Sequence, residues 1–243
     1  MSDVDLLWPN PASGLDDDAL LALTAMPEGR DWLRMNFIAS IDGAATRDGR
    51  SGALGDAADR RLFGLLRRPA DAILLGAGTA RIEGYGAMRL DDASVAWRRE
   101  RGMPPHPVFV LISRSLRLDP ASPIFTEAPV RPIVCTVAEA RAGEFADVAD
   151  VIVCGAGDVD PLRVRAELAD RGLRGVHGEG GPHVFGSFLA AGAVDALHLT
   201  LAPTLEGGAS GRIVAGSPSV PTDMRLASVL RSGDELLLHY VRD

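Results

Sequence analysis

The hydrophobic pattern of the chain predicts short buried strands that alternate with amphipathic helices. Residues 72–75 are all apolar, which is typical of a strand buried on both faces of a parallel sheet. In residues 183–191 the apolar positions recur at spacings of one, three and four, which places a single apolar stripe on a helix. The same criteria predict strands over 32–39, 108–112, 132–136, 151–154, 173–177 and 196–201, and helices over 16–23, 56–68, 137–145 and 161–171.

This alternation predicts the fold class. Strands and helices that alternate along the chain indicate an α/β domain of three layers with a mostly parallel sheet. Two further apolar runs, 224–230 and 236–241, flank Ser232-Gly233-Asp234 and predict an antiparallel C-terminal edge hairpin. Residues 1–30 are acidic and weakly periodic, so we expect an N-terminal arm, followed by one domain over 31–243.

Composition and charge narrow the classes of function. The net charge of -8 over 243 residues disfavours nucleic acid and anionic membranes as partners. No run approaches the ~20 apolar residues of a membrane span. The first residues carry no basic region of a signal peptide, so we expect a cytoplasmic protein. All 25 basic residues are arginine, which excludes Schiff-base lysine chemistry and a Walker phosphate loop.

A glycine turn, Gly178-Glu179-Gly180-Gly181-Pro182, joins a predicted strand to the helix that follows. Pro182 suits the first helical position, and the free amides of a helix N-terminus attract phosphate or pyrophosphate. Glu179 does not suit a phosphate cradle, so we expect its carboxylate to face another group. The alternative is that the glycines only make a tight turn between strand and helix.

Other predicted strands also end in polar or glycine-rich segments, where parallel sheets bind ligands. These segments are Asp42, the turn Gly76-Ala77-Gly78-Thr79 and Ser113-Arg114. Two glycine turns suggest a dinucleotide, although the Rossmann spacing fails because His183 holds the place of its last glycine.

Arginines near these turns are candidates for anion binding. Arg114 would meet a 2′-phosphate and select NADP over NAD, or it is simply an exposed arginine. Arg67 and Arg89 would hold a substrate phosphate, although Arg67 would equally complement a helix dipole. His177-Gly178-Glu179 matches the first part of a zinc deaminase signature, but the paired cysteines of that signature are missing, so no metal is expected. Cys135 and Cys154 lie in apolar runs and are expected to be buried thiols.

Taken together, these segments resemble the pyrimidine reductase family of riboflavin biosynthesis, which has a dihydrofolate-reductase-like fold. The resemblance spans roughly residues 32–241 and is closest to stand-alone actinobacterial members without a deaminase half. It rests on Asn36-Phe37-Ile38-Ala39-Ser40-Ile41-Asp42-Gly43, Arg67-Arg68-Pro69-Ala70-Asp71-Ala72-Ile73-Leu74, the two glycine turns and Val194-Asp195-Ala196.

The resemblance implies an NADPH-dependent enzyme that reduces a ribosylamino-pyrimidine 5′-phosphate and opens its ribose to a ribitol chain. It assigns to NADPH the residues Thr79, Glu83, Ser113, Gly180, Gly181, Pro182, His183 and Val184, and to the substrate Ser51, Arg67, Arg89 and Glu179. From their places at strand ends we add Gly76, Gly78 and Arg114 to the NADPH residues, and we add Asn36 to the substrate residues. Asn36 replaces the lysine of bifunctional members, and Glu83-Gly84-Tyr85 departs from an Asp-Asp-Pro segment.

For catalysis, we expect Asn36 to orient the sugar and Asp42 or Glu83 to relay the proton. A dihydrofolate or pterin reductase is an alternative within enzymes, and a non-catalytic NADPH-binding sensor is an alternative of another class. Since the family usually pairs its domains, we also expect a homodimer.

Overall fold

The computed structural model describes residues 3–243. The helices are α1 (Asp17–Leu23), α2 (Ala57–Arg67), α3 (Ala77–Glu83), α4 (Asp92–Glu100), α5 (Pro123–Thr126), α6 (Pro161–Asp170) and α7 (Pro182–Ala190), with 3₁₀ turns η1 (Ser51–Ala53) and η2 (Gly143–Phe145). The strands are β1 (Asp5–Trp8), β2 (Trp32–Ser40), β3 (Ala72–Gly76), β4 (Val108–Ile112), β5 (Ile133–Thr136), β6 (Asp150–Val153), β7 (Gly175–Gly178), β8 (Ala196–Ala202), β9 (Arg225–Ser232) and β10 (Glu235–Val241).

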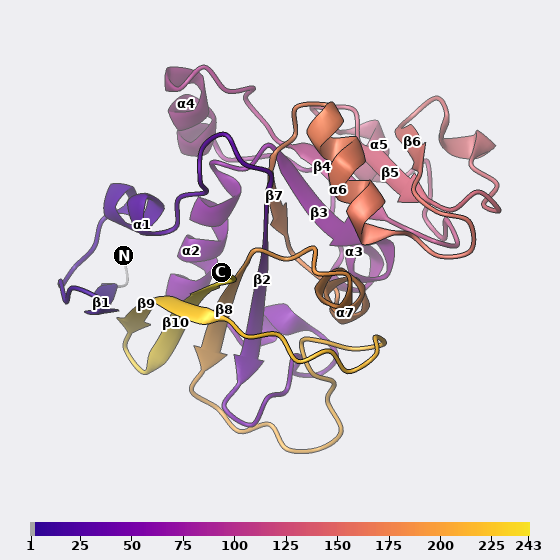
Figure 1. Cartoon of the computed structure of the whole chain (residues 1–243). Helices are drawn as coiled ribbons and strands as arrows, with labels where there is room; N and C mark the ends of the chain where they lie inside the picture. The colour runs from indigo at the N-terminus through magenta and orange to yellow at the C-terminus, as the bar shows by residue number, and fades with distance from the viewer. Residues whose placement is uncertain (1–2) are drawn as a thin grey trace.

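The described strands form one 10-stranded sheet in the order β1-β9-β10-β8-β2-β7-β3-β4-β5-β6 (Figure 1). From β8 to β6 neighbouring strands are parallel, whereas β10, β9 and β1 pair antiparallel. The predicted mostly parallel sheet with its C-terminal hairpin is therefore confirmed. One addition is that β1 pairs with β9, so the sheet ends on an N-terminal strand.

Helices cover both faces of this sheet. On one face α6 and α7 pack on β2 to β6, through Val164, Phe185 and Phe188. On the other face α3 and α5 pack on β3 and β4, and α1 and α2 pack on β9 and β10. The three-layer arrangement that the alternating pattern predicted is thus present.

Helix starts follow the predicted capping chemistry. Asp16 and Asp56 are the N-caps of α1 and α2, and their carboxylates accept hydrogen bonds from amides of the first turn. Pro182 occupies the first turn of α7, and Gly192 follows that helix with a positive φ of 67°.

Two predicted segments differ in the structure. The helix expected over 137–145 is wrong, because only the 3₁₀ turn η2 forms there and Phe145 is buried under the sheet. Gly76 to Thr79 is not a loop, since β3 runs directly into α3 at Ala77.

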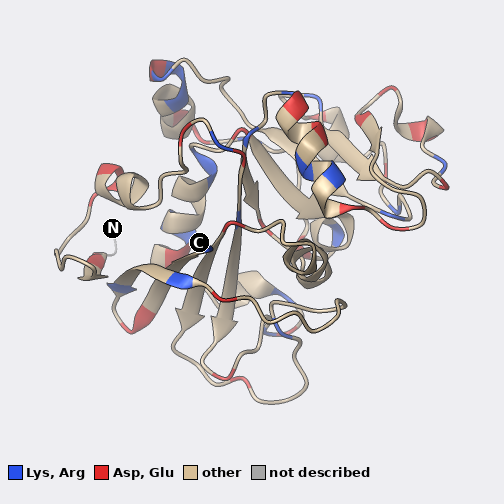
Figure 2. Ribbon diagram, in the orientation of Figure 1, with Lys and Arg blue, Asp and Glu red and all other residues tan. Residues whose placement is uncertain are grey.

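Charged residues lie mainly on helices and loops, and the strands carry few of them (Figure 2). Cys135 and Cys154 are buried free thiols, as predicted. Within residues 3–243, no helix has the length and apolar character needed to span a membrane.

Candidate active site

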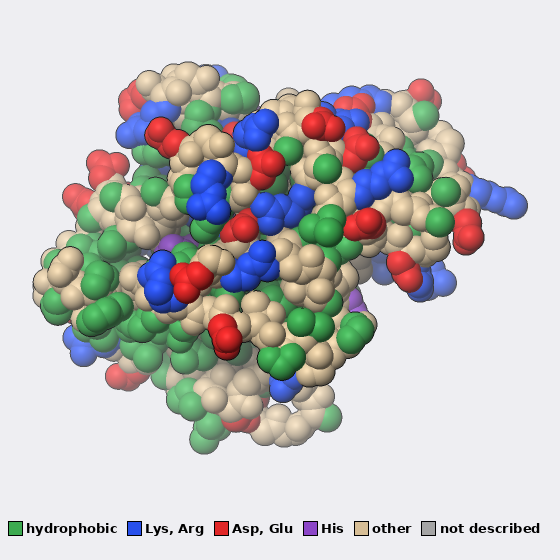
Figure 3. Space-filling model, viewed as in Figure 1, with side chains coloured by type: hydrophobic (Ala, Val, Ile, Leu, Met, Phe, Trp, Pro, Cys, Tyr) green, Lys and Arg blue, Asp and Glu red, His purple; other side chains and the backbone are tan. Residues whose placement is uncertain are grey.

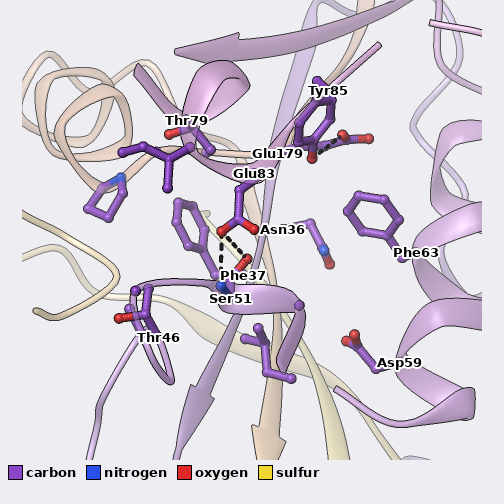
Figure 4. A pocket seen from close by; sticks show the side chains of 18 of the residues that line it. Asn36, Phe37, Thr46, Ser51, Asp59, Phe63, Thr79, Glu83, Tyr85 and Glu179 are labelled. Carbon is purple, nitrogen blue, oxygen red and sulfur yellow. Dashed lines mark hydrogen bonds between the residues drawn. The ribbon is translucent and has the colours of Figure 1, made fainter. Parts of the chain in front are cut away.

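A cavity of about 380 Å³ opens at the carboxyl ends of β2, β3 and β7 (Figure 4). Parallel strands place their carboxyl ends at the same side of the sheet, so segments distant in sequence converge there. The cavity is lined by Asn36, Phe37, Ile38, Ala45, Thr46, Gly49, Ser51, Gly52, Asp59, Arg60, Phe63, Thr79, Ile82, Glu83, Tyr85, Glu179, Gly180, Gly181 and Pro182.

The two glycine segments of the sequence touch each other at this cavity. The amide of Gly76 donates a hydrogen bond of 2.8 Å to the carbonyl of Gly180. A Cβ at Gly181 would lie 2.1 Å from the hydroxyl oxygen of Thr79, and a Cβ at Gly76 would lie 2.9 Å from Val184. Because α3 and α7 approach so closely, a side chain at either position would displace Thr79 or Val184.

Glu179 forms the most deeply buried polar contact of the cavity. Its fully buried carboxylate accepts two hydrogen bonds from Arg67, at 2.5 and 2.6 Å, and one of 3.0 Å from the hydroxyl of Tyr85. Arg67 also lies over the ring of Phe63, 4.4 Å from its centroid. Burial, followed by the charge of Glu179, raises the pKa of Tyr85, so its proton stays in place.

Glu83 holds the loop that covers the cavity. Its Oε1 accepts hydrogen bonds from the amide and the hydroxyl of Ser51, both at 2.9 Å (Figure 4). Because Glu83 lies on α3 and Ser51 on η1, the carboxylate ties η1 to α3. The Ser51 hydroxyl is thereby fixed beside a carboxylate inside the cavity.

The predicted site residues divide into those that line the cavity and those that do not. Gly76, Gly78, His183 and Val184 belong to the elements that build the wall but do not line the cavity. Ser113 is buried at the end of β4, and the exposed Arg89 donates to the carbonyl of Glu127. The lining contains Asn36, Ser51, Thr79, Glu83, Glu179, Gly180, Gly181 and Pro182.

Asp42 also lies outside the lining. Its carboxylate accepts hydrogen bonds from the hydroxyl of Ser40 and from the amides of Glu206 and Gly207, which lower its pKa to about 2. The structure therefore gives Asp42 a position that organises the loop after β8. Arg67, paired with Glu179, lies beside the cavity.

Arg114 contributes to a second depression, of about 550 Å³, beyond the ends of β4 and β5. Arg114 forms an exposed ion pair with Asp158, and Arg141 lines the same depression.

Sequence reasoning missed the contribution of α2. In the structure Asp56 caps α2, while Asp59 and Phe63 line the cavity. The acidic residue at the third helical position was visible, but periodicity does not reveal which side of a helix borders a cavity.

Comparison with known proteins identifies the family of this chain. Residues 31–238 match the model of the RibD C-terminal domain. The chain belongs to this family. A reductase of Methanothermobacter thermautotrophicus, named for 2,5-diamino-6-ribosylamino-4(3H)-pyrimidinone 5′-phosphate, is 28% identical over 222 residues, which are 87% of this chain and 98% of that protein.

Solved structures agree with this family assignment. A pyrimidine reductase-like protein of Corynebacterium diphtheriae superposes with a TM-score of 0.80 and 33% identity, over 88% of this chain and 93% of the other. A Thermotoga maritima protein named as a diaminohydroxyphosphoribosylaminopyrimidine deaminase and 5-amino-6-(5-phosphoribosylamino)uracil reductase shares the fold, with a TM-score of 0.63 and 22% identity, over 88% of this chain and 57% of that one.

Proposed function

We propose that this protein is an NADPH-dependent reductase of a ribosylamino-pyrimidine 5′-phosphate. The observation that carries the proposal is one cavity with two different ends. One end consists of Thr79 on α3 and the backbone at the start of α7, and the other presents Asn36, Ser51 and Glu179. Membership of the RibD C-terminal domain family supports this division between cofactor and substrate.

The cofactor end fits a pyrophosphate and nicotinamide. The amides of His183 and Val184 lie in the first turn of α7, where helical geometry leaves N–H groups without acceptors in the helix. Thr79 adds a hydroxyl beside Gly181. We assign the depression beside Arg114 and Arg141 to the 2′-phosphate end, which makes NADPH the preferred dinucleotide.

NADPH, when bound, supplies a hydride. In the open-chain substrate, C1′ is doubly bonded to nitrogen; hydride addition at C1′ and one proton at nitrogen convert this imine to the ribitylamine. We assign Asn36 to orient the ribose. We assign Glu83 and the Ser51 hydroxyl that it holds to relay the proton: Ser51 gives its proton to the nitrogen and regains one through Glu83, which takes it from solvent water. Asp42 is not assigned a catalytic role, because it lies outside the cavity lining and holds a loop.

We further propose that the protein is a homodimer. On β8 and β10, Leu197, Leu199 and Leu201 lie opposite Tyr240, Leu238 and Leu236, and all six side chains are half-buried. Hydrophobic side chains gather over this part of the molecule in Figure 3. Such a continuous apolar face on a sheet is typical of a surface that a second subunit covers.

The proposal is tested by NADPH consumption with purified protein and two substrates offered in parallel. We expect turnover with the ribosylamino-pyrimidine phosphate and little with dihydrofolate. Preference for dihydrofolate would replace the proposal by a pterin reductase. NADPH binding without turnover of either compound would instead support a sensor.

A further inference from the structure

The carboxylate of Asp59 is a feature of the cavity that the proposed function does not use. Asp59 lies in the first turn of α2 and lines the cavity on the same side as Phe63, across from Glu83 (Figure 4). Its Oδ2 lies against Gly55, where a Cβ would approach to 2.2 Å. A side chain at Gly55 would therefore displace this carboxylate.

The hydrogen-bonding state of Asp59 differs from that of the other cavity carboxylates. Glu179 accepts three hydrogen bonds, from Arg67 and Tyr85, and Glu83 accepts two from Ser51 through Oε1. The hydroxyl of Thr200 and the charge of Arg60 act on Asp59, and among the described residues no ion pair holds its carboxylate. Its neighbour Arg60 donates instead to the carbonyl of Gly55, at 3.1 Å. Since a carboxylate has about four acceptor positions, Asp59 retains acceptor positions for N–H donors of a ligand.

Two further acidic residues, Asp56 and Glu235, lie near Asp59. Asp56 and Glu235 lie close together, and Glu235 is only 2% exposed. Burial and the like charge of Asp56 raise the pKa of Asp59 above its usual value. A carboxylate in this situation is stabilised by a ligand that donates hydrogen bonds, because such a ligand replaces the lost water.

The substrates in the names of two relatives differ at the 2-position of the pyrimidine, where such a carboxylate would accept a hydrogen bond. The archaeal reductase is named for a 2,5-diaminopyrimidinone, and the Thermotoga maritima protein for an aminouracil. In the first, N3–H and the 2-amino group are adjacent, parallel donors that match both oxygens of a carboxylate. In the uracil the 2-position is a carbonyl, which would place an acceptor against an acceptor.

We propose that Asp59 is a specificity-determining residue that binds the 2-amino-4-oxo side of the pyrimidine, so that the protein prefers the diaminopyrimidinone over the uracil. This inference rests on the proposed function and specifies its substrate. A site built for hydrogen-bond donors discriminates strongly against an analogue that lacks them, so we expect a preference of about 100-fold or more in kcat/KM. Dihydrofolate presents the same 2-amino-4-oxo group but lacks the phosphoribosylamine.

The test compares kcat/KM for the diaminopyrimidinone, the uracil and dihydrofolate at saturating NADPH. Asp59→Asn should lower the value for the diaminopyrimidinone about 100-fold and leave that for the uracil equal or higher, because the amide NH₂ donates to a carbonyl. The matched control, Asp56→Asn, removes a neighbouring charge outside the cavity lining and keeps a good N-cap, so the preference should remain. NADPH binding, followed by fluorescence, shows that each variant is folded.

The outcomes separate the two proposals. Equal turnover of both pyrimidines by the wild-type protein would overturn the role of Asp59 while the proposed function stands. An unchanged preference in Asp59→Asn, or an equal change in Asp56→Asn, would also overturn it. Reduction of dihydrofolate alone, lost in Asp59→Asn, would confirm the recognition chemistry and overturn the proposed substrate.

Discussion

Glu179 shows how one acidic residue in a glycine turn organises the polar end of the cavity. The sequence indicated that Glu179 would face something other than phosphate, and its carboxylate accepts from Arg67 and Tyr85. Arg67, expected to hold a substrate phosphate, is occupied by this carboxylate. A buried ion pair is costly to break from one side, because the remaining charge keeps no partner.

Replacing Glu179 by glutamine should therefore destabilise the protein. We expect the free energy of unfolding to fall by about 3 kcal/mol, measured by urea denaturation. The double variant Glu179→Gln, Arg67→Met removes both charges and should recover part of the loss. If the double variant loses more unfolding free energy than the two single variants lose together, this interpretation is contradicted.

Glu235 makes stability depend on pH. Burial, with the charges of Asp56 and Asp59, raises its pKa from 4.5 to about 8. Between these values the folded protein holds a proton that the unfolded chain has released, so stability falls as the pH rises from about 4.5 to about 8. A difference of this size amounts to at most about 5 kcal/mol.

In Glu235→Gln this pH dependence should largely disappear, leaving the variant more stable than the wild type at pH ~8. Urea denaturation at several pH values between the two limits measures the slope. Glu100→Gln, at an exposed position of α4, is the control and should keep the wild-type slope. If Glu235→Gln also keeps the wild-type slope, a group other than Glu235 causes the pH dependence.

At the scale of elements, the parts of the fold that follow local rules were predictable. Asp16 and Asp56 mark the starts of α1 and α2, and the all-apolar run at β3 predicts a buried parallel strand. β1 was missed because its four residues form a strand only through pairing with β9. The helix expected over 137–145 does not form. A 3₁₀ turn forms there instead and buries Phe145 against the sheet. Tertiary contacts overrode local preference in both cases.

The candidate site was predictable only in part, for a related reason. Glycines and polar residues at strand ends signal a ligand site, and eight of the residues expected there line the cavity. Asp59 and Phe63 belong to a helix whose pattern is that of an ordinary packed helix. Their role depends on which part of α2 extends past the sheet, and sequence spacing contains no such information.

The contact between α3 and α7 predicts the effect of a single methyl group. Gly181→Ala would place a Cβ 2.1 Å from the Thr79 hydroxyl oxygen, so the Thr79 side chain or the turn before α7 must shift. We expect NADPH affinity to fall about tenfold, as overpacking costs of 1–3 kcal/mol imply, measured by fluorescence titration. Gly64→Ala in α2 meets no atom within 4 Å and should leave NADPH affinity unchanged. Unchanged affinity in Gly181→Ala would show that the turn does not contact the cofactor.

At the scale of the whole molecule, the two halves of the sheet differ in how they are covered. Helices cover both faces of β3 and β4, whereas Leu199 and Leu238 form part of a half-exposed apolar face on β8 and β10. We expect Leu199→Glu to convert a dimer to a monomer in sedimentation velocity. Leu162→Glu, at a 55% exposed leucine of α6, should remain dimeric. If the wild-type protein sediments as a monomer, the proposed homodimer is wrong.

Hydride transfer to C1′ is the central claim, and isotopic labelling tests it most directly. The purified protein would be given NADPH deuterated at the transferred position together with the ribosylamino-pyrimidine phosphate, and the product examined by mass spectrometry and NMR. We predict one deuterium per product molecule, at C1′ of a ribityl chain. A product labelled in the pyrimidine ring, or oxidation of NADPH that leaves the pyrimidine phosphate unlabelled, would contradict the account.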